Sequence, residues 1–339
     1  MRAPLRTLDA AVRYLLPLAT IFALIAAAAF VLPGALGPAA APPDQGDEAA
    51  GADDADPHPD LVGAARPARD ELPAPTPATV SGAQGVEAAS LPQTGPPPAP
   101  ARPPPGPPRA SAVLPILMYH HVGLLPPNPD GIRRDLTVAP DRFEGLLKYL
   151  AENRIQTVYL DQLLDHWAGR DELPAPAVAL TFDDGYDDNY DYAFPLLRKF
   201  GMAGTFFIVT DLVGRSGYMN WSQLEEMAQS GMSIQAHSAN HADLTAVAPA
   251  ELNRQLVAPK RLLEERLGQP VRFLAYPSGR FNRAVIVAAH AAGYEAAVTV
   301  NFGTIQQAAG PYELRRVRVR GADTVEQLVA RLTPPSWRR

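Results

Sequence analysis

Two adjacent carboxylates form the first group of residues that could perform chemistry. Asp183 and Asp184 follow directly after Ala177–Phe182, a run whose composition is typical of a buried strand, and a glycine comes next. Asp-Gly alone is more typical of a turn. At the end of a buried strand, two neighbouring carboxylates are equally suited to acid–base catalysis or to metal binding, so both interpretations stand beside the turn.

A pair of histidines forms the second group. His237 and His241 are two of only seven histidines in the chain, and they follow the predicted strand at 233–236. On a helix this spacing would resemble a zinc protease motif, but such a site needs a glutamate after the first histidine, where this chain has Ser238. Either histidine alone would more often be an ordinary loop residue. Together with the aspartate pair, they suggest two imidazoles and one carboxylate around a metal.

The elements expected around these residues alternate between extended and helical patterns. The predicted strands are 116–119, 157–159, 177–182, 204–209, 233–236, 273–276, 295–299 and 316–319. The predicted helices are 140–153, 160–169, 190–200, 221–230, 249–267 and 282–292. This alternation predicts a mainly parallel sheet, and the number of strands suits a barrel better than an open sheet. Functional residues are then expected at the C-terminal ends of the strands, where both polar groups fall.

Composition divides the chain into parts. More than half of the 37 prolines lie between Pro33 and Pro108, in a stretch dominated by Ala, Pro, Gly and acidic residues. Such a stretch cannot bury enough apolar surface to offset its ordering entropy. We therefore predict a disordered Pro/Ala-rich linker at 38–112, one folded domain at 113–332 and a short tail at 333–339.

The N-terminus predicts a membrane anchor. Its first fourteen residues carry three arginines and one aspartate, and an apolar run at 14–36 follows. The run is long enough to span a bilayer and longer than the apolar core of most signal peptides. We expect residues 1–37 to form a signal-anchor helix that leaves the domain extracytoplasmic, in the periplasm or at the cell surface. Cleavage near residues 39–41, which would give a secreted form, is the alternative.

Charge and cysteine content exclude several classes of function. The formal net charge is −6, and no basic face indicates a nucleic-acid partner. The chain has no cysteine, which removes disulfides, thiolate metal sites and cysteine nucleophiles.

The two polar groups carry a family resemblance. Residues 181–185, Thr-Phe-Asp-Asp-Gly, and residues 237–241, His-Ser-Ala-Asn-His, resemble the first and second motifs of the polysaccharide deacetylases, the family 4 carbohydrate esterases. The resemblance covers about Val113 to Leu332. It implies an α/β fold, a distorted (β/α) barrel with about seven mainly parallel strands.

The resemblance also implies roles for the candidate residues. Asp183 would be the general base, while Asp184, His237 and His241 would bind one divalent metal, zinc or else cobalt or nickel. The implied activity is removal of N-acetyl groups from an acetylated polysaccharide, a polymer of N-acetylglucosamine. An O-acetyl esterase and a catalytically weak glycan-binding module are the alternatives, and release of free acetate would separate them.

Two family motifs are incomplete in this chain. The third resembles Arg-x-Pro-Tyr/Phe-Gly, and residues 275–279 match only its proline and glycine, so the arginine that would orient the base is missing. Arg280, Arg315 and Arg316 are the candidates to replace it, and spacing does not choose among them. The C-terminal Leu-x-His motif is absent as well.

A histidine near the start of the domain could replace the missing C-terminal one. His120 follows the apolar run 114–119, which resembles the opening of permuted family members such as the poly-N-acetylglucosamine deacetylases of biofilms. The first and last strands of a closed barrel are neighbours, so moving a strand between the chain ends preserves the site. We therefore predict that His120 is the general acid, with a strand-end histidine bonded to the backbone as the alternative. His121 points to the opposite side of the strand and is disfavoured.

Overall fold

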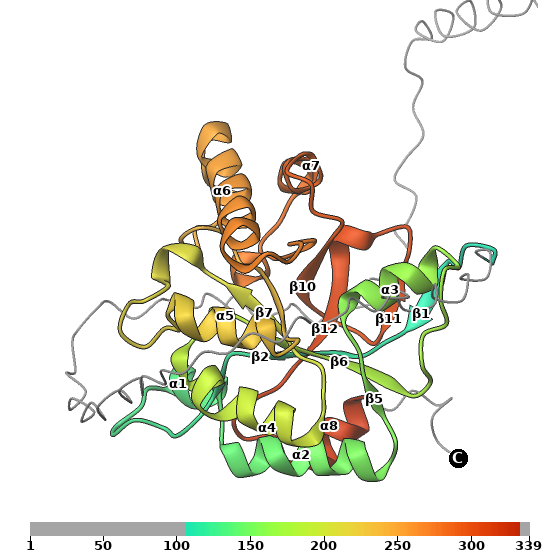
Figure 1. Ribbon diagram of the computed structural model, residues 1–339, viewed down its shortest axis with the longest axis vertical. Helices are drawn as coiled ribbons and strands as arrows, with labels where there is room; N and C mark the ends of the chain where they lie inside the picture. Colours follow the sequence, from blue (N-terminus) through green and yellow to red (C-terminus); the bar gives the residue numbers. More distant parts are fainter. Residues whose placement is uncertain (1–105, 333–339) are drawn as a thin grey trace, which may run out of the picture. The chain divides into compact units, whose positions relative to one another are not determined.

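The computed structural model describes residues 106–332, which form a closed barrel of parallel strands (Figure 1). Seven strands close the ring, and an eighth, β5 (Gln156–Thr157), pairs with β6 outside it. In order around the barrel they are β2 (Ile116–Tyr119), β12 (Leu314–Arg318), β10 (Ala296–Phe302), β9 (Phe273–Ala275), β8 (Ser233–Ala236), β7 (Thr205–Ile208) and β6 (Ala177–Phe182). The predicted barrel of about seven parallel strands is confirmed.

The first strand of the barrel closes the ring beside the last one. Strand β2 pairs in parallel with β12, with Leu117 opposite Val317 and Met118 opposite Arg318. On its other side β2 pairs in parallel with β6. This is the neighbour relation that the permutation argument for His120 required.

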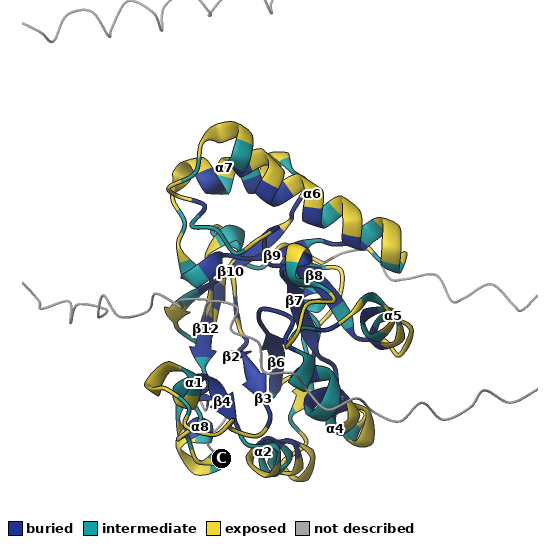
Figure 2. Ribbon diagram, turned by 90° about the vertical axis from the view of Figure 1, so that its left-hand side faces the viewer, coloured by how far each residue is buried: buried dark blue, intermediate teal, exposed yellow. Residues whose placement is uncertain are grey.

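Helices cover the outside of the barrel, and Figure 2 shows their exposed faces turned away from the buried strands. They are α1 (Gly131–Leu136), α2 (Pro140–Glu152), α3 (Leu160–Trp167), α4 (Phe194–Phe200), α5 (Trp221–Gln229), α6 (Pro249–Leu267), α7 (Arg283–Ala291) and α8 (Val325–Leu332). Local sequence sets several ends: prolines begin α2 and α6, Asn220 and Asn282 cap α5 and α7, and Gly268 ends α6 in the left-handed conformation.

Alternation along the strands separates two cores. Outward residues such as Leu117, Phe182 and Val317 pack in one cluster with residues of α2, α4, α6 and α8. The alternate strand residues, such as Ile116 and Leu314, point into the barrel and belong to a second cluster, which also includes residues of α3. Successive side chains of a strand point to opposite faces, so the residue that follows each strand has a predetermined direction.

Some elements were not predicted. Strand β1 (Ser111–Val113) pairs antiparallel with β11 (Ile305–Gln307). Strand β3 (His121–Val122) pairs with β4 (Thr137–Val138), and α1 and α8 are also new. The predicted helix at 190–200 starts as a π-helix, η1 (Asn189–Ala193), before α4.

The predicted anchor at 1–37, the linker up to residue 105 and the tail at 333–339 lie outside the described residues. Within residues 106–332, no helix has both the length and the apolar character needed to cross a membrane.

Candidate metal centre and catalytic pocket

A narrow pocket inside the barrel collects the residues singled out from the sequence. His120 follows β2, Asp183 follows β6, and His237 follows β8, so the strand ends deliver all three to it. The complete lining is His120, Asp183, His237, His241, Tyr276, Ser278, Gly279, Val300, Arg316 and Arg318. This is the C-terminal end of the parallel strands, where barrel enzymes carry their active sites.

Asp184, His237 and His241 converge as the sequence predicted. One ligand atom of each lies within 4.8 Å of those of the other two. The Nε2 atoms of His237 and His241 are 3.3 Å and 3.6 Å from Oδ1 of Asp184. The side chains of all three are almost fully buried. The arrangement is a possible site for one metal ion.

The donor atoms of this cluster fit a divalent cation. The carbonyl oxygen of Ala275 lies 2.8 Å from Nδ1 of His237, so this nitrogen donates its hydrogen and the lone pair of Nε2 faces Asp184. Both carboxylate oxygens of Asp184 are buried without a hydrogen-bond partner among the described residues. Hydrogen-bond acceptors that face one another away from water raise the free energy of the folded state, and a cation bound between them would remove this cost. Two imidazoles and one carboxylate are a common ligand set for zinc.

The loops that hold the cluster have unusual backbone conformations. Within residues 106–332, four of the six non-glycine residues with positive φ are Asp184, Ser238, His241 and Ser278, with φ of 71°, 63°, 62° and 51°. Such conformations are unfavourable for residues with a side chain, and they persist only where surrounding contacts enforce them. Their concentration here indicates that the fold holds these loops in one geometry.

Gln255 provides part of that support and was not predicted. It lies on α6, is fully buried, and its Oε1 accepts hydrogen bonds from the backbone nitrogens of Ala239 and Asn240 at 3.0 and 3.1 Å. Its Nε2 donates to Oδ1 of Asn240 at 2.7 Å. One amide side chain therefore fixes the loop between the two cluster histidines.

Of the three candidate replacements for the missing third-motif arginine, Arg316 is the one that contacts Asp183. Its Nη1 and Nη2 donate to Oδ1 and Oδ2 of Asp183 at 2.8 and 2.7 Å, and both side chains are almost fully buried. Of the other two candidates, Arg280 pairs with Asp243, and Arg315 is exposed. Burial would raise the pKa of Asp183, but the charge and hydrogen bonds of Arg316 outweigh it and hold that pKa below its usual value.

His120 and His121 point in different directions, as the alternation predicted. The side chain of His120 lines the pocket, and its Nδ1 is buried without a hydrogen-bond partner in the described part of the chain. Asn189 donates to its backbone carbonyl at 2.8 Å. His121 instead contacts Asp188, 2.8 Å from Nδ1 to Oδ2, and stacks on Tyr186. Burial lowers the pKa of His120 to about 4.

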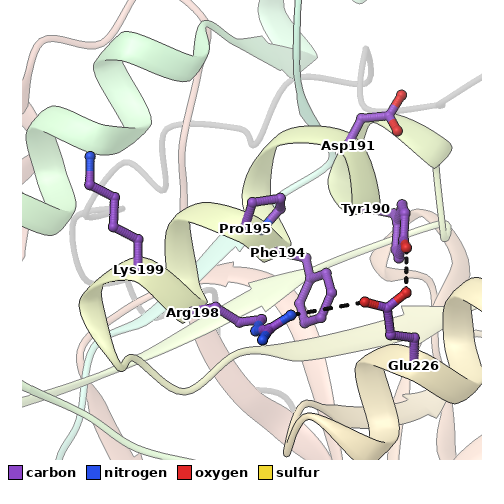
Figure 3. Close-up of a pocket in the computed structure, with 7 residues that line it drawn as sticks. All are labelled: Tyr190, Asp191, Phe194, Pro195, Arg198, Lys199 and Glu226. Carbon is purple, nitrogen blue, oxygen red and sulfur yellow. Dashed lines mark hydrogen bonds and ion pairs between the residues drawn. The ribbon is translucent and has the colours of Figure 1, made fainter.

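A larger hollow of about 460 Å³ lies elsewhere, between η1, α4 and α5 (Figure 3). Its lining consists of Tyr190, Asp191, Phe194, Pro195, Arg198, Lys199 and Glu226. Glu226 accepts a hydrogen bond from the Tyr190 hydroxyl at 2.5 Å and lies 3.9 Å from Nη1 of Arg198. Lys199 pairs with Glu144, which lies outside the lining. None of the lining residues belongs to the metal cluster, so the inner pocket is the candidate active site.

The parallel barrel thus carries a possible metal site and an arginine-paired aspartate at the C-terminal ends of its strands, where barrel enzymes have their active sites. A family model for polysaccharide deacetylases matches residues 170–297. The relative named "Putative polysaccharide deacetylase YxkH" from Bacillus subtilis is 34% identical over 209 residues, which cover 61% of this chain and 72% of that protein. The chain therefore belongs to the polysaccharide deacetylase family. This confirms the resemblance to the family 4 carbohydrate esterases that the sequence motifs indicated, and with it the prediction of a deacetylase.

Two further proteins are similar to this chain. The poly-beta-1,6-N-acetyl-D-glucosamine N-deacetylase of Staphylococcus aureus is 22% identical over 212 residues, with 58% of this chain and 72% of that protein covered. The solved structure of the Streptococcus pyogenes deacetylase PplD in complex with acetate superposes with a TM-score of 0.61 at 31% identity. The superposition covers 67% of this chain and 100% of the PplD chain.

Proposed function

We propose that this protein hydrolyses N-acetyl groups on an extracytoplasmic polysaccharide, a polymer of N-acetylglucosamine, with the help of one divalent metal. The observation that carries the proposal is the buried cluster of Asp184, His237 and His241 beside Asp183 and its arginine partner. A polymer of N-acetylglucosamine is the substrate that the name of the S. aureus relative gives, and acetate, the expected product, is bound in the S. pyogenes deacetylase structure.

Asp184, His237 and His241 would hold the metal, with zinc favoured by the ligand set and cobalt or nickel as alternatives. When bound, a divalent cation supplies a Lewis acid for the acetyl carbonyl and lowers the pKa of water. The side chains of the three residues are almost fully buried, which strengthens the electrostatic interactions among them.

Asp183 accepts the proton of the attacking water in this mechanism. Its low pKa means that the carboxylate is ionised at neutral pH and therefore able to act as a base. The two hydrogen bonds from Arg316 also fix the orientation of the carboxylate. The backbone N–H of Ser278, in the strained loop of the pocket, would donate to the oxyanion that develops on the acetyl group.

His120 delivers a proton to the departing amine. An amine is a poor leaving group until it is protonated, so amide cleavage depends on this acid. With a pKa of about 4, the imidazole is neutral at neutral pH in the free protein. It must therefore gain its proton after the substrate binds, when negative charge on the substrate oxygen favours the imidazolium.

Acetate release tests this proposal against the two alternatives. Hydrolysis of an N-acetylglucosamine oligomer, lost on chelation and restored by zinc, supports the deacetylase. Release from O-acetylated but not N-acetylated oligosaccharides would identify an O-acetyl esterase. Oligosaccharide binding without any acetate release would identify a glycan-binding module.

The proposed location rests on the N-terminal sequence, in which basic residues precede the apolar run at 14–36. With residues 1–37 as a signal-anchor, the full-length chain should fractionate with membranes, and added protease should reach the domain at 113–332 from the extracytoplasmic side. A soluble form that begins near residue 41 would show cleavage and secretion instead.

A further inference from the structure

The backbone of His120 is held by a side chain from the segment that also carries the two site aspartates. Asn189, the first residue of η1, is fully buried, and its Nδ2 donates to the carbonyl oxygen of His120 at 2.8 Å. Asp183 and Asp184 begin the same segment. Residues 183–189 thus carry the proposed base and one proposed metal ligand, and they also contact the backbone of the proposed acid.

The residue before Asn189 adds a second contact between the same two segments. Oδ2 of Asp188 lies 2.8 Å from Nδ1 of His121, and Arg133 contacts Nε2 on the other side of this ring. Because the guanidinium can only donate, Nε2 accepts and Nδ1 donates to the carboxylate. The side chains of His121 and Asp188 are 4% and 13% exposed. The peptide between His120 and His121 is therefore held at its carbonyl and through the side chain that follows it.

The direction of the His120 imidazole depends on this backbone. Within residues 106–332, its Nδ1 is buried without a hydrogen-bond partner, so no carboxylate or carbonyl orients the ring through this nitrogen. Functional histidines are commonly oriented by such a bond, as His237 is by the carbonyl of Ala275 at 2.8 Å. For His120, the position of the peptide takes over this task.

The surroundings of Asn189 indicate that stability alone does not explain an asparagine there. The carbonyl of His120 can only accept, so the amide nitrogen has to face it. This leaves Oδ1 of Asn189 buried without a hydrogen-bond partner among the described residues, which raises the free energy of the folded state. An apolar side chain of similar size would avoid this cost. What an asparagine supplies at this position is the bond to His120.

We propose that Asn189 is a positioning residue for amide cleavage, which acts through the carbonyl of His120 and holds the imidazole where it can protonate the departing amine. This inference rests on the proposed function and adds a link between the acid and the segment of the base. Without the amide donor, the carbonyl loses its partner, so the peptide turns toward another donor and the ring moves with it. A displacement of about 1 Å at a catalytic group can lower a rate by about 100-fold.

The test compares kcat and KM for an N-acetylglucosamine oligomer with those for an activated acetyl ester, whose leaving group needs no proton. Asn189→Leu and Asn189→Ala both remove the donor, and they differ in the space that they leave. Gln306→Leu is the matched control. Gln306 is also a buried amide, and its Nε2 donates at 2.9 Å to the carbonyl of Leu114, which precedes β2 at the end opposite His120.

Both Asn189 variants should lower kcat for the oligomer by about tenfold to 100-fold, keep KM within about twofold, and change ester hydrolysis by less than about threefold. Their zinc affinity should remain native. Gln306→Leu should affect the two substrates alike. In a His120→Ala background, Asn189→Leu should cause no further loss on the oligomer, because it acts only through the imidazole.

Equal losses on amide and ester, native kcat in both Asn189 variants, or a further loss of about tenfold in the His120→Ala background would overturn the proposal. The same amide-selective loss in Gln306→Leu would overturn it too. Should Asn189→Leu not fold, as judged from its melting curve, the amide-to-ester ratio of Asn189→Ala decides.

The failure of the proposed function has a different signature. If the native chain cleaves no acetamido group, that function fails, and crystal structures still test Asn189. The His120 ring should point into the pocket in the native protein and should be displaced in Asn189→Ala. An unmoved ring in the variant would contradict the positioning role.

Discussion

Arg316→Met removes the guanidinium that faces Asp183 and leaves a carboxylate buried without a counter-charge. The side chains of the pair are 1% and 3% exposed, so water cannot replace the lost partner. Breaking one side of a buried ion pair of this kind costs about 3 to 5 kcal/mol. Activity should fall by about 100-fold or more, because the base loses both the hydrogen bonds that orient it and the positive charge that favours its ionised form.

The pH dependence of this loss follows from the sign of each pKa shift. In the native chain the pKa of Asp183 is lowered, so its pairing stabilises the fold above the unfolded pKa of about 4 and is lost as the pH falls through the folded pKa. In the variant, the charge and hydrogen bonds of Arg316 no longer lower the pKa of Asp183, and burial, the largest effect, raises it. The difference in unfolding free energy should therefore be largest near pH 8 and shrink as the pH falls toward about 4.

Denaturant unfolding of metal-free protein between pH 4.5 and 8 measures this difference. Arg315→Met is the matched control, because its side chain is exposed on the same strand, and it should change stability by less than about 0.5 kcal/mol. Combining Arg316→Met with Asp183→Asn removes both charges, so the double variant should cost less than the sum of the single ones, by about 2 kcal/mol. A pH-independent loss, or additive costs, would refute the role of Arg316 in holding Asp183 ionised.

Three other predictions concern the site. Asp183→Asn should keep the metal and lose activity, whereas Asp184→Asn should lose both, which metal analysis and acetate release separate; the opposite pattern would reverse the two roles. His120→Ala should lower amide hydrolysis by about 10²- to 10⁴-fold, leave metal affinity intact and affect an activated ester much less, whereas equal losses on both substrates would remove it as the acid. Gln255→Leu, which touches no ligand directly, should weaken metal binding by about tenfold to 100-fold in a competition titration, and unchanged affinity would show that the loop holds without it.

The sequence predicted the barrel because its strands and helices alternate with regular polarity. Most strand positions agree with the structure within about two residues, since composition alone marks buried runs such as Ala177–Phe182. The antiparallel pairing of β1 with β11 was missed because it joins segments nearly 200 residues apart along the chain, and short half-exposed strands carry little periodicity.

Site residues were predictable where a motif identifies them, or where alternation along a strand determines the direction of their side chains. His120 follows an apolar strand whose neighbours could be inferred from barrel closure, and parity distinguished it from His121. To choose Arg316 over Arg315, one must know which side chains of β12 point into the barrel. The alternation of arginine and valine at 316–319 already indicated this direction. Gln255 gave no signal, because its contacts depend on how α6 packs against the loop.

Metal content measured together with acetate release tests the central claim most directly. The purified chain, freed of metal by a chelator, should release no acetate from an N-acetylglucosamine oligomer and should recover activity in proportion to added zinc, up to one equivalent per chain. His237→Ala should neither bind this equivalent nor recover. Full acetate release by the metal-free protein, or full recovery of His237→Ala with one equivalent of zinc, would contradict the assignment of Asp184, His237 and His241 as the metal site of a deacetylase.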